Sequence, residues 1–124
     1  MYKTEKVGKN THKGCDAMQV ELTREAGQLT AHLVGELDHH SAAPIRQQID
    51  AAALGCRCSR LTLDLSRLTF MDSSGIGLIM GRYRMMTAGG GTLRVENAPP
   101  RVEHMMQMAG LNRLPIWNER KDVL

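Results

Sequence analysis

A mixed α/β fold is predicted for this chain, because segments with the periodicity of strands alternate with segments that have the periodicity of helices. The chain has 124 residues, of which 42% are hydrophobic and 23% are charged. This size and composition are typical of one globular domain with one modest core. Right-handed strand–helix–strand connections predict a mainly parallel sheet, to which an opening hairpin would add an antiparallel strand.

Residues 1–16 are expected to form a mobile N-terminal tail. This segment holds four lysines, two glycines and few residues that could be buried, so the entropy cost of ordering it would not be compensated. The folded domain is therefore expected to span residues 17–124.

A hairpin and a helix are predicted next. Apolar and polar residues alternate over 18–22, a turn follows at 25–27, and 29–37 forms a second extended run. Ser41 can then cap a helix that Gly55 ends. The apolar residues on one face of that helix are Ile45, Ile49 and Ala52 or Ala53.

Strand and helix patterns also alternate in the second half. Residues 60–65 predict a strand, and DSSG at 72–75 opens a helix to Met86, because Asp and Ser accept hydrogen bonds from the N–H groups of a first turn. Three glycines at 89–91 end this helix.

The remaining chain is predicted to form a strand, a helix and a last short strand. The first strand is Thr92–Glu96. Pro99 and Pro100 introduce the helix, whose apolar residues follow the i, i+3, i+4, i+7 spacing. The last strand is expected over 113–117.

The charge pattern and the apolar runs exclude several function classes. The net charge of +3 is spread along the chain without a basic block, which disfavours nucleic-acid binding. The apolar runs fall short of the roughly 18 residues of a membrane span, and the first residues lack a signal-peptide core. We therefore expect a cytoplasmic protein, in which Cys15, Cys56 and Cys58 are reduced thiols.

Two hydroxyl groups, Ser73 and Ser74, fall at the predicted start of a helix. A phosphate is favoured there by roughly 0.3–1 kcal/mol through the helix dipole, and Gly75 leaves the backbone open to close approach. Asp72 would repel the added charge of about −2, so phosphorylation could reverse the charge of a surface. The alternative is that Asp72, Ser73 and Ser74 only cap the helix. A serine hydrolase is disfavoured because the G-x-S-x-G pattern is missing.

Two further patterns could form ligand sites. Gly75, Gly77 and Gly81 lie within an apolar helical stretch and are best explained by close packing, although weak nucleotide binding at the helix start stays open as an alternative. GELDHH, at 35–40, lacks the spacing of a metal site. We expect a polar loop there, with Asp38 able to face Ser73.

The segments GELDHH and LTFMDSSGIGLIMGRYR (68–84) resemble the signature of the STAS-domain anti-sigma factor antagonists, particularly those acting on sporulation sigma factor F. The resemblance keeps the same order and spacing over about 18–117, and AGLNRL (109–114) resembles the end-of-helix segment of the family. It implies a single STAS domain, with a small mixed sheet and helices mainly on one side.

The resemblance also implies a switch. Ser73 would be phosphorylated by an anti-sigma factor that is a serine kinase, and a serine phosphatase of the PP2C type would reset it. Only the unphosphorylated form would bind the anti-sigma factor and release the sigma factor. The partner would contact the neighbourhood of Ser73. No cofactor, metal, nucleic acid or membrane is expected to take part in this binding. The residues of that neighbourhood are Asp38, Asp72, Ser74, Gly75 and Gly77.

Two other functions are compatible with the sequence. One is a STAS scaffold or stress-signalling subunit without direct sigma-factor control. The other is an enzyme that uses Asp38, His39 and Asp72. Arg82 and Tyr83 continue the family motif. A solvated face for Arg82 and a core position for Tyr83 explain them at least as well.

Overall fold

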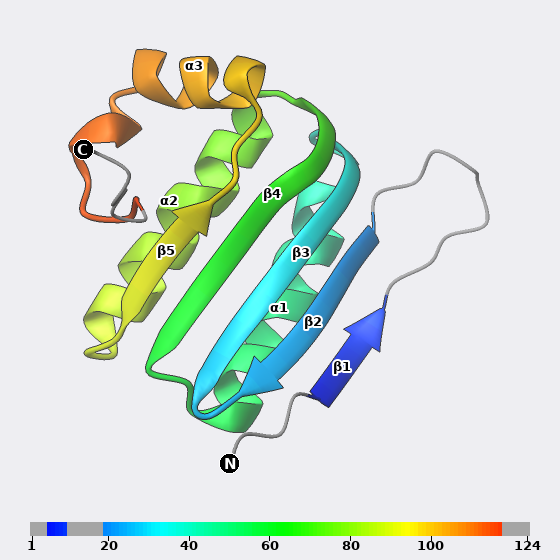
Figure 1. The fold of residues 1–124 in the computed structure, drawn as a ribbon, viewed down its shortest axis with the longest axis vertical. Helices are drawn as coiled ribbons and strands as arrows, with labels where there is room; N and C mark the ends of the chain where they lie inside the picture. Colours follow the sequence, from blue (N-terminus) through cyan, green and yellow to red (C-terminus); the bar gives the residue numbers. More distant parts are fainter. Residues whose placement is uncertain (1–4, 10–18, 118–124) are drawn as a thin grey trace, which may run out of the picture.

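The computed structural model describes residues 5–9 and 19–117, with the side chains of 19–117 apart from that of Cys56. Five strands form one sheet in the order β1-β2-β3-β4-β5. Helices α1 (Ala42–Cys56) and α2 (Ser73–Ala88) cover one face of this sheet, and α3 (Pro100–Met108) lies beyond one end of it (Figure 1). The predicted mixed sheet with helices mainly on one side is therefore confirmed.

The N-terminal strand differs from the expected mobile tail. β1 (Glu5–Lys9) pairs antiparallel with β2 (Gln19–Glu25). Backbone pairing of this kind needs no apolar side chains, because the open edge of β2 offers N–H and C=O groups to another strand. The rest of the predicted tail lies outside the described residues, and the boundary at residue 17 stays a prediction.

The predicted hairpin is confirmed in β2 and β3 (Gln28–Leu37), which pair antiparallel with Glu25 opposite Gln28. Ala26 and Gly27 form the turn with φ of 50° and 79°. Positive φ at both positions gives a two-residue turn whose twist matches that of the strands.

β4 (Arg60–Met71) continues beyond the predicted strand at 60–65, and it contains two bulges. It runs parallel to β3, and at two places it has one residue more than β3, between Asp64 and Arg67 and between Leu68 and Phe70. After Leu65 its buried residues are therefore Leu68 and Met71, three apart instead of two. A bulge shifts which residues face the core. The second half of this strand therefore does not show the alternation of apolar and polar residues by which a strand is predicted.

β5 (Thr92–Glu96) pairs parallel with β4, as predicted. The predicted last strand over 113–117 is mostly wrong. A 3₁₀ turn (Leu111–Arg113) ends at the first of these residues, and Trp117 makes one isolated parallel bridge to Val95. The Trp117 indole N–H donates to the Leu111 carbonyl at 3.1 Å, which folds this segment back on itself.

The core lies between the sheet and its covering helices. Side chains alternate along β2 and β3, so one face of the sheet is apolar and the other is polar. The largest fully buried side chains are Leu29, Leu33, Leu37, Ile45, Ile49, Leu61, Leu63, Leu65, Ile79, Met106, Leu111 and Ile116.

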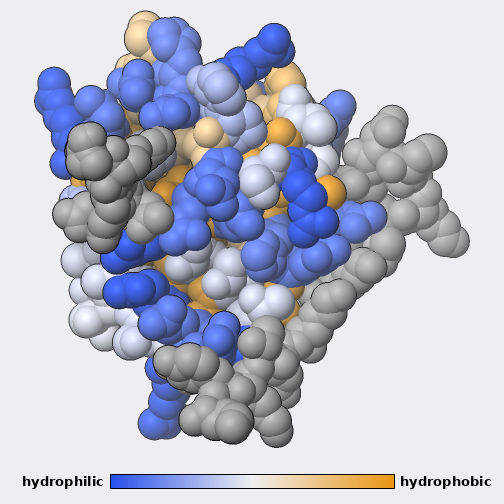
Figure 2. Space-filling view, in the orientation of Figure 1, coloured by the Kyte–Doolittle hydropathy of each residue, from blue (hydrophilic) through white to orange (hydrophobic). Residues whose placement is uncertain are grey.

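The other face of the sheet is open and hydrophilic (Figure 2). His32 Nδ1 lies 2.9 Å from Asp64 Oδ2, and the Asn97 amide donates to Asp64 Oδ1 at 3.2 Å. Burial raises the pKa of Asp64, but hydrogen bonds from Ser66, Asn97 and His32 outweigh it, so the pKa lies below its ordinary value. Polar pairs of this kind hold adjacent strands in register.

Cys58 follows α1 and is disulfide-bonded, which corrects the expectation of reduced thiols for this residue. Counting cysteines along a sequence cannot reveal which of them approach one another in space. Within 5–9 and 19–117, no helix is long and apolar enough to cross a membrane.

Candidate functional site

The two motif segments meet at one edge of the sheet. β3 and β4 are parallel, so their carboxyl ends lie at the same edge, with Leu37 opposite Met71. The N–H of Asp72 donates to the carbonyl of Leu37 at 3.2 Å. This bond places the loop that starts at Asp38 directly beside the start of α2.

Asp38 organises the first of these loops. Its Oδ1 accepts hydrogen bonds from the N–H groups of His40 (3.0 Å) and Ser41 (3.1 Å). The bond from Ser41, followed by that from His40, holds the pKa of Asp38 below its ordinary value against the effect of partial burial. The prediction that Ser41 caps α1 through its side chain is wrong, because its hydroxyl donates back to the carbonyls of Glu36 and Asp38.

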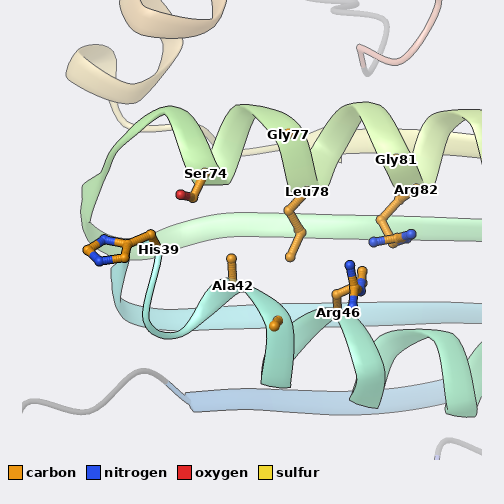
Figure 3. Close-up of a pocket in the computed structure, with 9 residues that line it drawn as sticks. His39, Ala42, Arg46, Ser74, Gly77, Leu78, Gly81 and Arg82 are labelled. Carbon is orange, nitrogen blue, oxygen red and sulfur yellow. The ribbon is translucent and has the colours of Figure 1, made fainter.

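Asp72 caps α2 as the sequence predicts. Its backbone is extended, and its Oδ1 accepts a hydrogen bond from the N–H of Ser74 at 2.8 Å. Ser73 is the first residue of the helix and is exposed, whereas Ser74 is half-buried and its hydroxyl lies on the side facing α1 (Figure 3). Of the two adjacent hydroxyl groups, that of Ser73 is the more accessible to a modifying enzyme.

Gly75 and Gly77 lie in different surroundings. Gly75 is buried, and a Cβ there would clash with Met71 Cγ, lie 2.6 Å from Met71 Sδ and lie 3.1 Å from Leu37 Cδ2. The close approach predicted for Gly75 is therefore made to this protein's own strand ends. Gly77 is exposed, and a Cβ there would meet no atom of the described residues within 4 Å.

Arg82 is buried, with only 7% of its surface exposed, so the alternative of a solvated face is wrong for this residue. Its Nε lies 3.0 Å from Asp50 Oδ1 on α1, but the two atoms are not aligned as a hydrogen bond and form an ion pair only. Burial lowers the pKa of Arg82, Asp50 raises it, and the nearby Arg46 lowers it further. A signal was available, since Arg82 stands four and three residues after the buried Leu78 and Ile79 and so falls on the same helix face.

Two hollows flank the start of α2. One, of about 320 Å³, lies between α1 and α2 and extends from Ser74 to Arg82 (Figure 3). The other, of about 450 Å³, lies between the end of β4 and the start of α3 and is lined largely by apolar residues. Phe70, which lines the second hollow, is 47% exposed.

The remaining polar residues of the first loop are His39 and His40, whose ring centroids lie 3.9 Å apart. Both are exposed. Across 5–9 and 19–117, no group of three His, Cys, Asp or Glu residues is arranged to hold a metal ion.

The sequence is similar to that of known proteins. A family profile described as "Mlab, STAS domain" matches residues 18–116. The chain belongs to the STAS domain family. This STAS domain is 38% identical over 108 residues to an anti-sigma F factor antagonist of Paenibacillus polymyxa, covering 86% of this chain and 92% of the relative. It is 39% identical over 94 residues to one of Lysinibacillus sphaericus, covering 75% and 79%.

Solved structures give the same result for the STAS domain. The anti-sigma factor antagonist SpoIIAA in its unphosphorylated form matches with a TM-score of 0.71 at 33% identity, over 83% of this chain and 89% of that one. The Bacillus cell fate determinant SpoIIAA in its phosphorylated form matches with a TM-score of 0.65 at 33% identity, over 86% and 93%. The homologues of this STAS domain are thus anti-sigma factor antagonists, which are regulatory proteins, and their fold is known with and without the phosphate.

Proposed function

We propose that this STAS domain is an anti-sigma factor antagonist controlled by phosphorylation of Ser73. In its unphosphorylated form it binds an anti-sigma factor that is also a serine kinase, and the sigma factor is released. A serine phosphatase of the PP2C type removes the phosphate. The domain acts in the cytoplasm, where sigma factors work, and has no enzymatic activity of its own.

The position of Ser73 is the main support for this proposal. Ser73 is exposed at the first position of α2, beside the carboxylate of Asp72 and next to the loop of Asp38. A phosphate there meets the N–H groups of the helix start and leaves the fold in place. It also brings a charge of about −2 to a surface that already holds two carboxylates.

The charge explains why binding would be switched off. A partner that approaches this surface must remove water from the new dianion or face its repulsion, and an uncompensated buried charge costs several kcal/mol. A loss of about 4 kcal/mol weakens binding about 1,000-fold. We assign the partner surface to Asp38, Asp72, Ser74 and Gly77, with the exposed Phe70 beside it as an apolar contact.

The role of Gly75 is indirect in this proposal. It lets the start of α2 pack against Met71 and Leu37, and so it positions Ser73 without touching the partner. Nucleotide binding at the helix start stays a prediction, and the switch does not require it.

The decisive experiment pairs mass spectrometry with a binding measurement. The protein is incubated with ATP and the serine-kinase anti-sigma factor encoded by the same organism, and the phosphorylated peptide is identified. We expect one phosphate on Ser73 and none in Ser73→Ala. In Ser74→Ala the phosphate should still be found on Ser73, whatever its rate of transfer, which distinguishes the two adjacent hydroxyl groups. Calorimetry should show that Ser73→Ala binds the anti-sigma factor like the unmodified protein and that Ser73→Asp binds at least about 100-fold more weakly.

Equal binding by Ser73→Ala and Ser73→Asp would refute the switch. A partner that binds but transfers no phosphate would favour the STAS scaffold without direct sigma-factor control. Hydrolysis of ATP or GTP by the purified protein, lost in Asp72→Ala, would instead favour an enzyme.

A further inference from the structure

The hollow between α1 and α2 is lined on the α2 side by two glycines, besides Ser74, Leu78 and Arg82. Gly77 and Gly81 both line it, and a Cβ at either position would meet no atom of the described residues within 4 Å. Two glycines four residues apart in a helix interior cost stability relative to alanine. In return, they keep a groove open along the outer surface of the helix pair; we call it the α1–α2 groove.

The charge of this groove is positive. Arg46 on α1 and Arg82 on α2 both line it, and their guanidinium groups converge between the two helices (Figure 3). His39 lies at its other end, beside Ser74. Among the described residues that line the groove there is no carboxylate. The nearest counter-charge is Asp50, which forms the ion pair with Arg82.

Arg82 is less compensated than a buried cation usually is. Its side chain is only 9% exposed, and within the described part of the chain neither Nη1 nor Nε has a hydrogen-bond acceptor. A guanidinium group carries five N–H donors in a planar fork. Buried arginines normally satisfy this fork with carboxylate or phosphate oxygens. Asp50 supplies one unaligned oxygen, so donors remain for a second anion.

We propose that the α1–α2 groove is an oxyanion-binding site, in which Arg82 and Arg46 bind a carboxylate or phosphate group. The volume of about 320 Å³ is at the small end of the range for ligand pockets. The open helix face at Gly77 and Gly81 lets the group carrying the anion lie against the backbone of α2. Two sources share this chemistry: a free small oxyanion, or an acidic side chain of the partner proposed to bind at Ser73.

The first arm of the test uses free anions. Sodium phosphate and sodium succinate are titrated separately into ¹⁵N-labelled protein, with sodium chloride adjusted to hold the ionic strength constant. Saturable shifts are expected in the amide signals of Gly77 and Gly81 and in the Nε–H signal of Arg82, with a Kd on the order of 1–10 mM.

Three variants define the site. Arg46→Gln should weaken binding about tenfold, because it removes a charged donor from an exposed position without disturbing the core. Gly81→Leu should abolish binding by filling the groove, while thermal unfolding shows that the fold is kept. Arg84→Gln is the matched control, since Arg84 is an exposed arginine of the same helix that does not line the groove.

The second arm rests on the proposed function and measures the affinity of the anti-sigma factor for the same variants. If Arg46→Gln loses at least about fivefold in affinity and Arg84→Gln does not, while free anions fail to saturate, the occupant is a carboxylate of the partner. If a free anion saturates the groove and Arg46→Gln binds the partner as tightly as the unmodified protein does, the occupant is a small molecule. If neither free anions nor the partner distinguish Arg46→Gln from Arg84→Gln, the inference is overturned. If the unmodified protein binds no partner, the proposed function fails and the first arm alone decides.

Discussion

Helix α2 meets the rest of the molecule differently at its start and along its middle. At the start, Gly75 is buried against Met71 and Leu37, and a methyl group has no space there. In the middle, Gly77 and Gly81 border an open groove in which a methyl group would touch nothing described. One motif therefore contains glycines of two kinds. The first kind fixes where the switch serine lies, and the second leaves a surface free for a ligand.

The largest effect on stability is expected for Gly75→Ala. The added methyl group must displace Met71, so the free energy of unfolding should fall by about 1–3 kcal/mol despite the better helix propensity of alanine. Urea denaturation measures this change. In a Met71→Ala background, which removes the clashing atoms, the same substitution should cost clearly less. Equal costs in both backgrounds would mean that α2 does not pack on β4 as described.

An intermediate effect is expected for Asp72→Ala, because it removes the acceptor of the 2.8 Å bond from the N–H of Ser74. Loss of an N-cap side chain costs about 1 kcal/mol. The measurement is again urea denaturation, and Asp72→Asn, which keeps an oxygen at this position, should restore most of the loss. A similar loss in Asp72→Asn would show that the charge of Asp72, rather than its capping bond, stabilises the helix start.

The smallest effect, of opposite sign, is expected for Gly77→Ala. Because space is open at this position, alanine should raise the free energy of unfolding by about 0.5–1 kcal/mol through helix propensity and the lower entropy of the unfolded chain. It serves as the matched control for Gly75→Ala. If both substitutions destabilise the protein, the distinction between the two kinds of glycine is wrong.

Much of the fold could be predicted from local patterns, and its misses have identifiable causes. The hairpin, both long helices and β5 follow from periodicity and from turn and cap residues. The extension of β4 through Met71 was missed because two bulges convert a spacing of two into a spacing of three. β1 was missed because an edge strand can pair through its backbone without an apolar pattern. The segment ending at Trp117 was predicted as a strand because extended propensity does not reveal that its indole bonds back to Leu111.

The site divides in a similar way. The capping role of Asp72 and the position of Ser73 at the start of a helix could be read from the order of residues, since both depend on neighbours within four positions. The ion pair of Arg82 could not, because it depends on Asp50, which stands on another helix more than thirty residues earlier. Close packing was predicted for all three glycines of the motif. It is confirmed for Gly75 but wrong for Gly77 and Gly81, because a sequence does not show which positions have atoms packed against them.

The sequence by itself determined the hairpin, the two long helices, the cap of α2 and the serine that stands at its start, because these rest on local hydrogen bonds and on the periodicity of apolar residues. Only the tertiary structure decided which of two adjacent serines is exposed, which glycines are crowded and where two arginines converge. Those properties depend on how α1, α2 and the strand ends pack together, and packing joins residues whose distance along the chain carries no information about their contact.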